Sequence, residues 1–581
     1  MRKQYSKKAA AIVAGLLVAA QLVACGGGST SGSTASSAPS TASSTAPAAQ
    51  SEAPAAVGQE GFEAPDHANL DVSGDFVKNK ETVSLKFGMA QGATVTDYKD
   101  NKLTKWLEET CNVDLSFDLY PASDAASKIR ILISSGSDMP DAFLMGNFPA
   151  LDVYNYGSEG AIIPLEDYVD TYGTYYQIAL ASDEKYRRQL TMPDGHIYSI
   201  PDITESIPNS FSQRAWINQS WLDKLGLEIP TTTDELYDVL TAFVNQDPNG
   251  NGKKDEIGVA GSVLGWRQQA YNWIMNSFIY NSYQNDSTMR LNVADDGKTI
   301  YTPVVTDEWR AGLSYMRKLC DEGLYSPLAF SQDEQQYRAM LNTEEGSLVG
   351  LMIAGGKLID TEDAHNYVPM GPIEGPEGVA WAGYFPINPA NSMLITKDCK
   401  NPGAAFAVGD ALLSEEGSRR SRFGEPGVDF FEPGPEDISM LEDLGFAPSV
   451  VPTVNWGATT NAWWTTIHPT YRSWDLIAGQ CWDGNPLNGQ YYVCQAVPYY
   501  YGKQPEKVVS ALIYTQEEAD EIRDLQNTIC TYTKESIARF ITGDLDINDD
   551  GAWESYLKEL DNMKLDRVME INQQVYDRMY N

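Results

Sequence analysis

The most regular pattern in this chain starts at ETVSLKFGMAQ, residues 81–91, where Val83, Leu85 and Phe87 alternate with polar residues. Such alternation predicts a strand with one buried face. The following segments predict a helix over 101–111, a strand over 113–119, a helix over 124–134 that Asp124 caps, and a strand over 140–145. Strands and helices in this order are typical of a parallel sheet in an α/β fold.

The same rhythm returns later in the chain, and helices dominate its end. The later segments are a strand and helix over 216–225, a helix over 233–245, a helix over 402–413, and amphipathic helices over 517–540 and 551–580. The chain therefore predicts an α/β body followed by a mainly helical C-terminal part.

The first 25 residues read as an export signal. Four basic residues precede an apolar stretch from Ala9 to Val23, which is too short to span a bilayer comfortably, and LVAC at 22–25 ends it. This pattern resembles the lipobox of bacterial lipoproteins, in which the cysteine, here Cys25, is acylated. An ordinary secretory peptide is the alternative. Residues 26 to about 58 are nearly all Gly, Ser, Thr, Ala and Pro, which predicts a flexible tether.

Charge and length bound the function. The formal net charge is -38, and it becomes -42 once residues 1–24, with four bases and no acids, are removed. An acidic surface argues against a nucleic-acid partner, because phosphates need Lys and Arg contacts. About 520 residues remain after the tether, enough for two large lobes or three ordinary domains. Beyond the signal, no stretch reaches the length of a membrane-spanning helix.

The cysteines suggest neither a metal site nor a catalytic thiol. Six follow Cys25, at positions 111, 320, 399, 481, 494 and 530, without C-x-x-C pairs or histidines at metal spacing. Cys481 and Cys494 are placed to form a disulfide in an exported protein, and all six are equally compatible with buried thiols.

DPNGNGKKDE at 247–256 carries the sharpest chemical pattern. Oxygen side chains fall at loop positions 1, 3, 5 and 9, and Gly252 stands at position 6, where an EF-hand loop turns sharply. Position 12 is Gly258 rather than Glu, and Glu256 is the natural substitute. We expect a structural Ca²⁺ here, and a simple Asn/Gly turn is the alternative. The expected ligands are Asp247, Asn249, Asn251, the carbonyl of Lys253, Asp255 and Glu256.

Several short stretches resemble a known family when taken in order. They are DGHIYSIP (194–201), WIN (216–218), WLDKLG (221–226), PTTTDEL (230–236), EEG (415–417), FGEPGVD (423–429) and LDR (565–567). Together, from about residue 80 to the C-terminus, they resemble the extracellular solute-binding lipoproteins of carbohydrate ABC importers, of the large kind that serves oligosaccharides. Similar D-x-N-x-N-G loops occur in this family.

The resemblance implies a two-lobed α/β fold of the periplasmic-binding-protein kind (Venus flytrap, type II) with extra C-terminal helices. The chain would cross the hinge at 198–202 and again at 384–395. The implied organisation is a signal peptide at 1–24, the acylated Cys25 and linker at 25–75, lobe 1 at 80–202 and 388–450, lobe 2 at 203–387, and C-terminal elements at 451–581 that close lobe 2 and the hinge. The implied partners are a carbohydrate, ABC permease subunits and, through acylated Cys25, the membrane; we expect a monomer outside the cytoplasmic membrane.

Aromatic residues are the expected sugar contacts, because sugar rings present apolar faces and polar edges. The chain has 13 Trp and 32 Tyr. Trp216 and Trp221 are assigned to the core, whereas one member of the adjacent pair at 463 and 464 is expected to be exposed. The proposed ligand contacts are Trp463, Trp464, Trp456, Trp474, Trp266, Arg267, Trp273, Tyr384 and Asn388.

Two other classes of protein share parts of this pattern. A surface glycoside hydrolase needs two carboxylates at suitable spacing, which 80 acids do not exclude. Yet the sequence has no G-x-S-x-G, H-E-x-x-H or phosphate-loop motif, and its βαβ units stop short of eight repeats. A sugar-sensing or adhesive lipoprotein would show the same fold. We interpret the chain as a binder that breaks no bonds.

Overall fold

The computed structural model describes residues 61–360, 362–454, 458–465, 467–485 and 488–581. The signal peptide, Cys25, most of the linker and Trp456 lie outside these ranges, so what the sequence predicts for them stays a prediction.

A mixed six-stranded sheet forms the centre of what we call lobe 1. Its strands are, in spatial order, β16 (Thr470–Arg472), β6 (Ile200–Thr204), β13 (Ala390–Ile395), β5 (Ala142–Phe148), β3 (Val83–Gln91) and β4 (Val113–Pro121). β3 pairs in parallel with both β4 and β5, as the sequence pattern predicts, whereas β13 runs antiparallel to β5 and β6.

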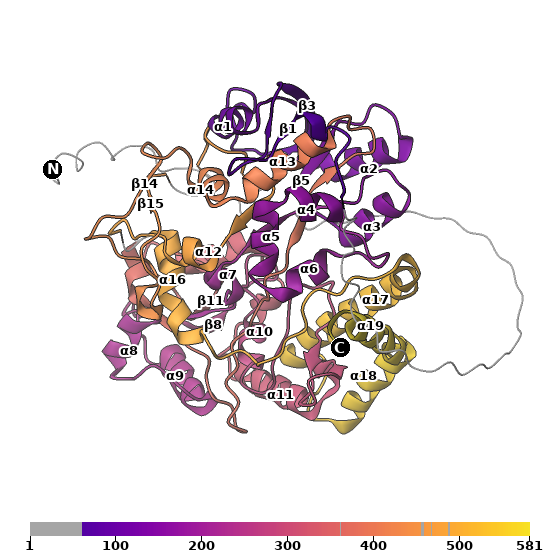
Figure 1. Cartoon of the computed structure of the whole chain (residues 1–581). Helices are drawn as coiled ribbons and strands as arrows, with labels where there is room; N and C mark the ends of the chain where they lie inside the picture. Colours follow the sequence, from indigo (N-terminus) through magenta and orange to yellow (C-terminus); the bar gives the residue numbers. More distant parts are fainter. Residues whose placement is uncertain (1–60, 361, 455–457, 466, 486–487) are drawn as a thin grey trace, which may run out of the picture. The chain divides into compact units, whose positions relative to one another are not determined.

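Helices cover this sheet and bury its apolar residues. They are α1 (Lys102–Cys111), α2 (Ala125–Ser135), α3 (Ala150–Ser158), α4 (Glu166–Tyr172), α5 (Thr174–Ala181), α6 (Glu184–Leu190), α13 (Pro402–Leu413) and α14 (Glu415–Phe423). In Figure 1 the orange α13 and α14 lie among indigo and purple elements, so distant parts of the chain build one lobe.

A four-stranded sheet forms the centre of lobe 2. Its spatial order is β12 (Tyr367–Met370), β7 (Ala215–Asn218), β11 (Val349–Ile353) and β8 (Ile257–Ala260), and β8 and β11 are parallel. The helices around its core are α7 (Ile207–Ser210), α8 (Gln219–Leu225), α9 (Thr233–Asn245), α10 (Ala270–Met275), α11 (Asp307–Asp321), α12 (Glu334–Leu341), α15 (Trp474–Ala478), α16 (Gly489–Tyr500), α17 (Gln516–Thr542), α18 (Asp550–Asn562) and α19 (Leu565–Tyr580). Three small sheets have two antiparallel strands each. They pair β1 (Leu70–Asp71) with β2 (Lys78–Asn79), β9 (Asn292–Val293) with β10 (Ile300–Tyr301), and β14 (Phe430–Phe431) with β15 (Val451–Pro452).

Within the described residues the chain passes between the two sheets at three places. The first crossing, 205–214, joins β6 to β7; the second, 371–389, joins β12 to β13; the third, at 473–474, joins β16 to α15. β6 therefore still belongs to lobe 1, and the chain leaves that lobe after Thr204 rather than within 198–202. α17 and α19 also reach the lobe 1 core, through Ile522, Ile571 and Val575.

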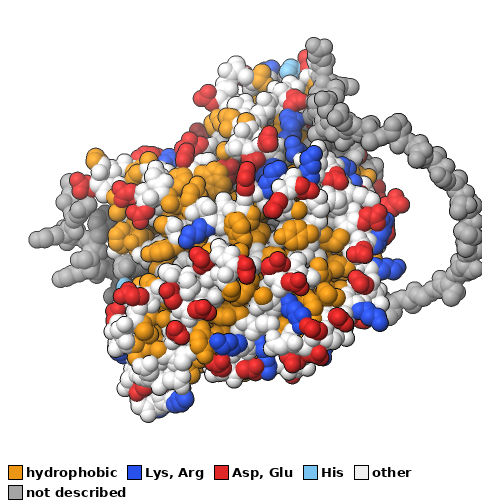
Figure 2. All heavy atoms as spheres, turned by 90° about the horizontal axis from the view of Figure 1, so that it is seen from below, with side chains coloured by type: hydrophobic (Ala, Val, Ile, Leu, Met, Phe, Trp, Pro, Cys, Tyr) orange, Lys and Arg blue, Asp and Glu red, His pale blue; other side chains and the backbone are white. Residues whose placement is uncertain are grey.

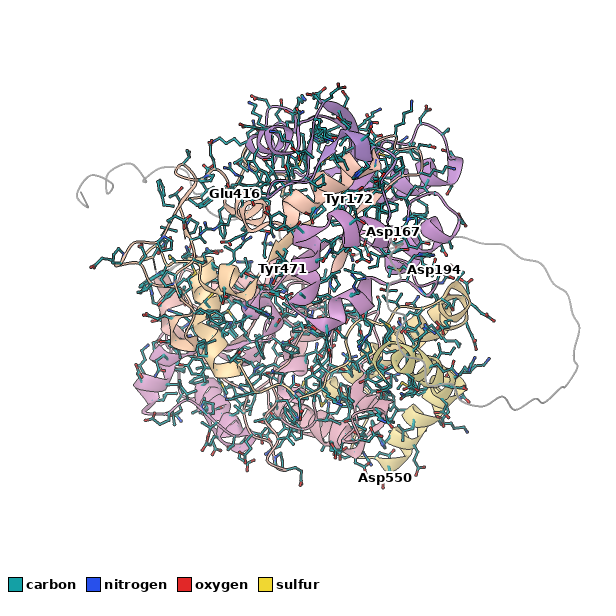
Figure 3. The ribbon with its side chains drawn as sticks, viewed as in Figure 1. Asp167, Tyr172, Asp194, Glu416, Tyr471 and Asp550 are labelled. Carbon is teal, nitrogen blue, oxygen red and sulfur yellow. The ribbon has the colours of Figure 1, made fainter. Side chains whose placement is uncertain are left out.

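The family-like motif at 194–201 folds against lobe 1. The Tyr198 hydroxyl donates to Asp194, which Figure 3 labels, over 2.9 Å. A Cβ on Gly157 would come within 2.4 Å of the Tyr198 ring, so glycine is needed for this close packing. The motif is therefore part of the structural frame of lobe 1.

One prediction for the C-terminal helices is wrong. The predicted helix over 551–580 is broken into α18 and α19, because Lys564 adopts a left-handed conformation with φ of 64°. Asp549 caps α18, the first of the two, by accepting a hydrogen bond from the Gly551 N–H. Asp124 precedes α2 as predicted but makes no side-chain cap hydrogen bond.

The predicted linker is also too long. Ala64 and Leu70 are buried in the lobe 1 core, and both Asp66 carboxylate oxygens accept backbone N–H bonds, at 2.9 Å each, from Gly403 and Ala404 at the start of α13. An acid at a helix N-terminus satisfies donors that the helix leaves open. The ordered body therefore begins before residue 75.

The part of the chain that the structure describes tests what the sequence indicates about disulfides, membrane-spanning segments and surface charge. The cysteines at 111, 320, 399, 481, 494 and 530 are all free thiols, so Cys481 and Cys494 form no disulfide. No described helix is long and apolar enough to cross a membrane. On the face in Figure 2, Asp and Glu side chains are scattered among hydrophobic ones, in keeping with the net charge of -38.

Candidate functional site

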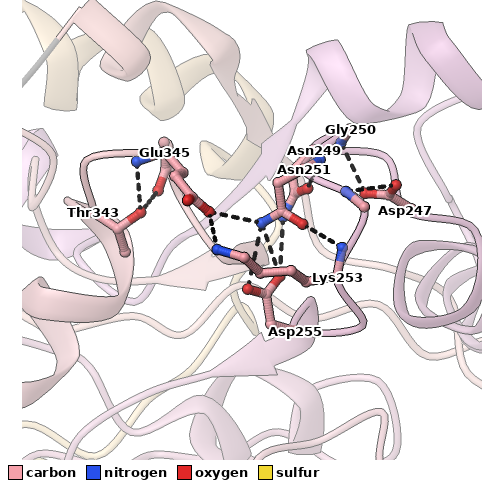
Figure 4. Close-up of polar contacts among 10 residues, drawn as sticks. Asp247, Asn249, Gly250, Asn251, Lys253, Asp255, Thr343 and Glu345 are labelled. Atoms are coloured by element: carbon pink, nitrogen blue, oxygen red, sulfur yellow. Dashed lines mark hydrogen bonds and ion pairs between the residues drawn. The ribbon is translucent and has the colours of Figure 1, made fainter.

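The loop at 247–256 follows α9 and is held by hydrogen bonds within itself (Figure 4). The Asp247 carboxylate accepts the N–H groups of Gly250 at 3.0 Å and Gly252 at 3.1 Å. The amide nitrogens of Asn249 and Asn251 donate to Asp255, at 3.3 and 3.2 Å. Asp247, Asn249, Asn251 and Asp255 are thus tied together by hydrogen bonds within one turn.

Glu256 is the residue of this loop that most needs a cation. Its side chain is 7% exposed, and neither carboxylate oxygen has a hydrogen-bond partner. Burial raises the pKa of the Glu256 carboxyl, and the neighbouring Asp247 and Asp255 raise it further. A buried carboxylate without a partner is unfavourable unless a charge or a proton compensates it.

The donor set fits Ca²⁺ in chemistry, although the carboxylates do not converge on one point. No group of three or more His, Cys, Asp or Glu among the described residues is arranged to hold a metal. In the arrangement present, the Asn amide groups turn their nitrogens to Asp255, and Lys253 Nζ lies 2.6 Å from Glu345 outside the loop. Rotating each amide by half a turn would present its oxygen instead.

The expectation that one of Trp463 and Trp464 is exposed is wrong. Both are buried in the lobe 1 core, at 2% and 0% exposure. Trp464 Nε1 donates to Thr104 Oγ1 over 2.8 Å, and its ring meets Phe117 edge to face at 5.5 Å. Adjacent side chains point apart, but here protein surrounds both directions, so neither ring faces solvent.

Trp273, also expected in the ligand site, is a core residue as well. It is 4% exposed, and its Nε1 donates to the Tyr500 hydroxyl over 3.0 Å. Trp216 and Trp221, assigned to the core from the sequence, are buried at 0% and 3%, which confirms that assignment.

Trp266 differs from these tryptophans, because it is half-buried at a sheet edge. It follows β8, and a Cβ on Gly355, just after the parallel strand β11, would lie 2.6 Å from its ring. The Arg214 guanidinium lies 5.9 Å from the same ring. Ligands of α/β proteins commonly bind outside the carboxyl ends of parallel strands, which is where this ring lies.

Further aromatic contacts involve Arg267, which follows Trp266 in the sequence, and residues of the first and second crossings. The guanidinium of Arg267 lies 3.4 Å from the centre of the Phe385 ring, and Arg267 Nη1 donates to the Gln284 carbonyl over 2.7 Å. The Tyr384 ring contacts Phe211 at 5.2 Å, and Phe211 contacts Tyr501 at 6.0 Å. Tyr501 is 51% exposed. We call Trp266, Arg267, Phe385, Tyr384, Phe211 and Tyr501 the aromatic strip.

Two residues with left-handed backbone conformation lie near strand ends, one in each lobe. Arg267 has a φ of 57° and Thr465 a φ of 67°, both in the left-handed region that non-glycine residues rarely adopt. Thr465 lies against Gly92, which follows the carboxyl end of β3. Such conformations cluster at ligand sites, and these two lie at strand carboxyl ends of the two different lobes.

Electrostatics distinguish the strip from the acidic surface. Arg214 is fully buried, and burial lowers its pKa to about 10; it donates to the carbonyls of Gly355 and Pro208. Burial likewise lowers the pKa of Arg267 to about 10. The half-buried Arg267 guanidinium, next to a ring face, can donate to the hydroxyl groups of a bound sugar, whereas the fully buried Arg214 supports the backbone.

Trp474 lies at the third crossing and Asn388 at the second, and neither belongs to the aromatic strip. The half-buried Trp474 packs against the cores of both lobes, and its backbone N–H donates to Glu205 over 3.1 Å. Asn388 is exposed, and its Oδ1 accepts from Ser510 at 2.6 Å and Gln189 at 3.1 Å.

Sequence reasoning missed Phe385 and Tyr501, and also Phe211, a core ring at 2% exposure that joins Tyr384 to Tyr501. A usable signal existed for Phe385, because it directly follows Tyr384 in the segment predicted to join the lobes. Tyr501 ends a run of three tyrosines, in which only Tyr500 is fully buried. Two surface hollows of lobe 1, one beside Tyr98 and Phe117 and one along α5, share no residue with the strip.

Comparison with known proteins places this geometry in context. Residues 89–419 match the model of the bacterial extracellular solute-binding protein family. The fructooligosaccharide ABC transporter substrate-binding protein FusA of Streptococcus pneumoniae is 29% identical over 528 residues, covering 86% of this chain and 91% of FusA. The polygalacturonan/rhamnogalacturonan-binding protein YtcQ of Bacillus subtilis is 24% identical over 57% of this chain and 64% of its own length.

Solved structures agree on the fold. FusA, crystallised as an EF-hand mutant with fructo-nystose, superposes with a TM-score of 0.64 and 27% identity, covering 85% of this chain and 99% of FusA. An extracellular solute-binding protein from Bifidobacterium longum subsp. infantis gives a TM-score of 0.71 at 20% identity, covering 87% and 99%. The expected two-lobed binding-protein fold is confirmed.

Proposed function

This chain belongs to the family of bacterial extracellular solute-binding proteins, and on that basis we propose that it captures an oligosaccharide between its lobes and delivers it to an ABC importer. The ligand would bind outside the carboxyl ends of the strands and stabilise closure about the crossings. Fructooligosaccharides are the first ligands to test, because FusA, the relative with 29% identity, is a fructooligosaccharide-binding protein.

The aromatic strip carries this proposal. Half-buried Trp266 supplies a flat platform, Arg267 supplies donors, and the exposed Tyr501 extends the strip. A sugar ring stacks its apolar face on an aromatic ring and directs its hydroxyls to polar neighbours. Because the strip holds several rings, it suits a chain of sugars better than a single one.

Titration calorimetry with a panel of oligosaccharides tests the proposal. We expect saturable binding of at least one oligosaccharide, weaker binding of its monosaccharide, and unchanged ligand on chromatography afterwards, because the protein breaks no bonds. Absence of heat with fructooligosaccharides and with plant and host glycans would contradict the proposed function. Release of reducing ends would instead indicate a hydrolase.

We further propose that the 247–256 loop holds a structural Ca²⁺. Asp247, Asn249, Asn251, the Lys253 carbonyl, Asp255 and Glu256 would be its ligands, and bound Ca²⁺ would compensate the buried Glu256 carboxylate. The carboxylates and amides of the loop would orient around the ion and so stiffen the connection between α9 and β8. The ion would supply rigidity and no chemistry, since no nucleophile belongs to the loop.

Thermal melting with and without a chelator tests the calcium site. Saturating Ca²⁺ at 100 times its Kd should add about 2.7 kcal/mol to the free energy of unfolding. Glu256→Gln should abolish the chelator effect, whereas Glu228→Gln, at an exposed acid between α8 and α9, should retain it. An equal melting temperature of the wild type in Ca²⁺ and in chelator would contradict the site.

Finally, we propose that acylation of Cys25 anchors the protein to the outer face of the cytoplasmic membrane. The supporting observation is the LVAC sequence ahead of a Gly/Ser/Thr/Ala/Pro tether. Two acyl chains would keep the binder near its permease. In cells, Cys25→Ser should move the protein from the detergent-rich phase to the medium; a membrane-bound variant would contradict the anchor.

A further inference from the structure

The short helix α6 contacts the first and second crossings directly and is linked to the third through Glu205. Its buried side chains Tyr186 and Gln189 are separated by three positions, so they lie on the same side of the helix. Tyr186 reaches toward the first and third crossings, and Gln189 reaches toward the second. One helix of lobe 1 is thus linked, directly or through one carboxylate, to each place where the chain leaves that lobe.

Glu205 joins the first crossing to the third. It is 1% exposed, and its Oε1 accepts from the Tyr186 hydroxyl at 3.0 Å and from the Ser182 hydroxyl at 3.2 Å. Its Oε2 accepts from the Trp474 N–H at 3.1 Å and from the Tyr471 hydroxyl at 3.5 Å. Four donors on one buried carboxylate fix the path of the chain, because removing any of them leaves charge less well satisfied.

Tyr471 and Trp474 connect this carboxylate to the rest of the hinge region. Tyr471, labelled in Figure 3, belongs to β16, and Trp474 begins α15 and packs against both cores. The Glu205 N–H also donates to the Arg472 carbonyl over 2.8 Å. The backbone of Trp474, at the third crossing, is therefore tied to the carboxylate that Tyr186 holds.

Gln189 joins the second crossing to the C-terminus. Its Nε2 donates to Ser510 Oγ at 2.8 Å and to the Tyr580 hydroxyl at 3.0 Å, and lies 3.1 Å from Asn388 Oδ1. Ser510 in turn donates to Asn388 at 2.6 Å, and Tyr580 donates to the Ala511 carbonyl at 2.6 Å. The second crossing, the 501–515 segment and the last turn of α19 thereby form one network.

We infer that α6 is the fixed block of the hinge, and that Tyr186 and Gln189 are positioning residues for ligand-driven closure. The helix holds one end of each crossing in place, and the rest of the crossing bends when the lobes close. Loosening either network would let the ligand-free lobes sample more orientations, so that closure on a ligand would order more of the molecule and affinity would fall. Asn388, expected as a ligand contact, acts in this network. The affinity effect rests on the proposed function, whereas the effect on lobe orientation does not.

Distance measurements between spin labels on the two lobes test the inference. The labels are placed by Lys128→Cys in α2 and Asp238→Cys in α9, both exposed positions. In the ligand-free protein, Tyr186→Phe combined with Gln189→Leu should broaden the distance distribution relative to the wild type. Glu184→Gln, at an exposed residue of the same helix, should leave it unchanged.

Binding provides the second measurement. The double variant should bind the best oligosaccharide at least tenfold more weakly. The gentler Tyr580→Phe keeps the ring, removes one hydroxyl, and should show the same changes to a smaller extent in a protein of near wild-type melting temperature. The inference would be overturned if both variants gave distance distributions as narrow as that of the wild type and affinities within twofold of it. A wild type that binds no glycan would overturn the proposed function, while the distance distributions would still decide the role of α6.

Discussion

Two tryptophan-containing segments that were both expected in the ligand site have opposite environments. Trp463–Trp464 lies inside lobe 1, where Trp464 bonds to Thr104 and packs on Phe117. Trp266–Arg267 lies at the edge of lobe 2, half-buried against Gly355 and Phe385. The difference shows that the function of an aromatic pair depends on what the fold places around it: a core ring stabilises, and an edge ring can bind.

The largest expected effect separates these roles by stability. Trp464→Ala should lower the free energy of unfolding by about 3–5 kcal/mol, because it empties a fully buried site. Trp266→Ala should lower it by about 1 kcal/mol, since its ring is partly exposed already. Chemical denaturation monitored by circular dichroism measures both values. Similar losses for the two variants would contradict the assignment of one ring to the core and the other to the edge.

Acid should weaken the buried segment specifically. Burial lowers the pKa of His468, whose ring lies 6.3 Å from that of Trp464, from 6.5 to about 4. The unfolded chain then binds a proton that the folded chain refuses, so stability is present above pH 6.5 and is lost as pH falls toward 4. The loss should reach about 3 kcal/mol at most. His468→Gln should remove this part of the pH dependence between pH 6.5 and 4; an unchanged slope would contradict it.

Affinity should show the reverse order of importance. Trp266→Ala should weaken oligosaccharide binding at least tenfold, about 1.4 kcal/mol, because it removes the stacking platform. The matched change Trp381→Ala, at another partly exposed tryptophan that is not on the strip, should leave the Kd within twofold. Calorimetry provides both constants, and equal effects would remove Trp266 from the site.

Two neighbouring glycines, Gly355 and Gly356, provide a matched test of the position of the Trp266 ring. A Cβ at Gly355 would lie 2.6 Å from the Trp266 ring, whereas one at Gly356 would lie 3.4 Å away. Gly355→Ala should therefore displace the ring and weaken binding about five- to tenfold, equivalent to about 1 kcal/mol. Gly356→Ala should change the Kd less than twofold, and a larger effect at Gly356 than at Gly355 would contradict the proposed ring placement.

Much of the fold was predictable because its signals are local. Alternation marked β3 and β4, and helical periodicity marked α1, α9, α13 and α17 to within two residues. The break at Lys564 was not predictable in this way, since the amphipathic pattern continues through it. Asp66 was read as linker because its partners, Gly403 and Ala404, are far away in the chain.

The candidate site was predictable in its kind and only partly in its residues. Trp266, Arg267 and Tyr384 lie together on the aromatic strip, whereas Trp463, Trp464 and Trp273 are core residues. Residue type and density indicated aromatic sugar contacts. They contained no information about which rings other segments cover.

The sequence by itself determined the features that neighbouring residues specify, namely the strand and helix periods and the glycine-bearing acidic loop, and it predicts an export signal with a tether. Only the tertiary structure decided which aromatic rings are exposed and which polar residues meet at the crossings. The physical reason is that burial arises from partners such as Thr104 and Trp464, which are 360 positions apart. No local pattern encodes such contacts, because they form only when whole lobes have assembled.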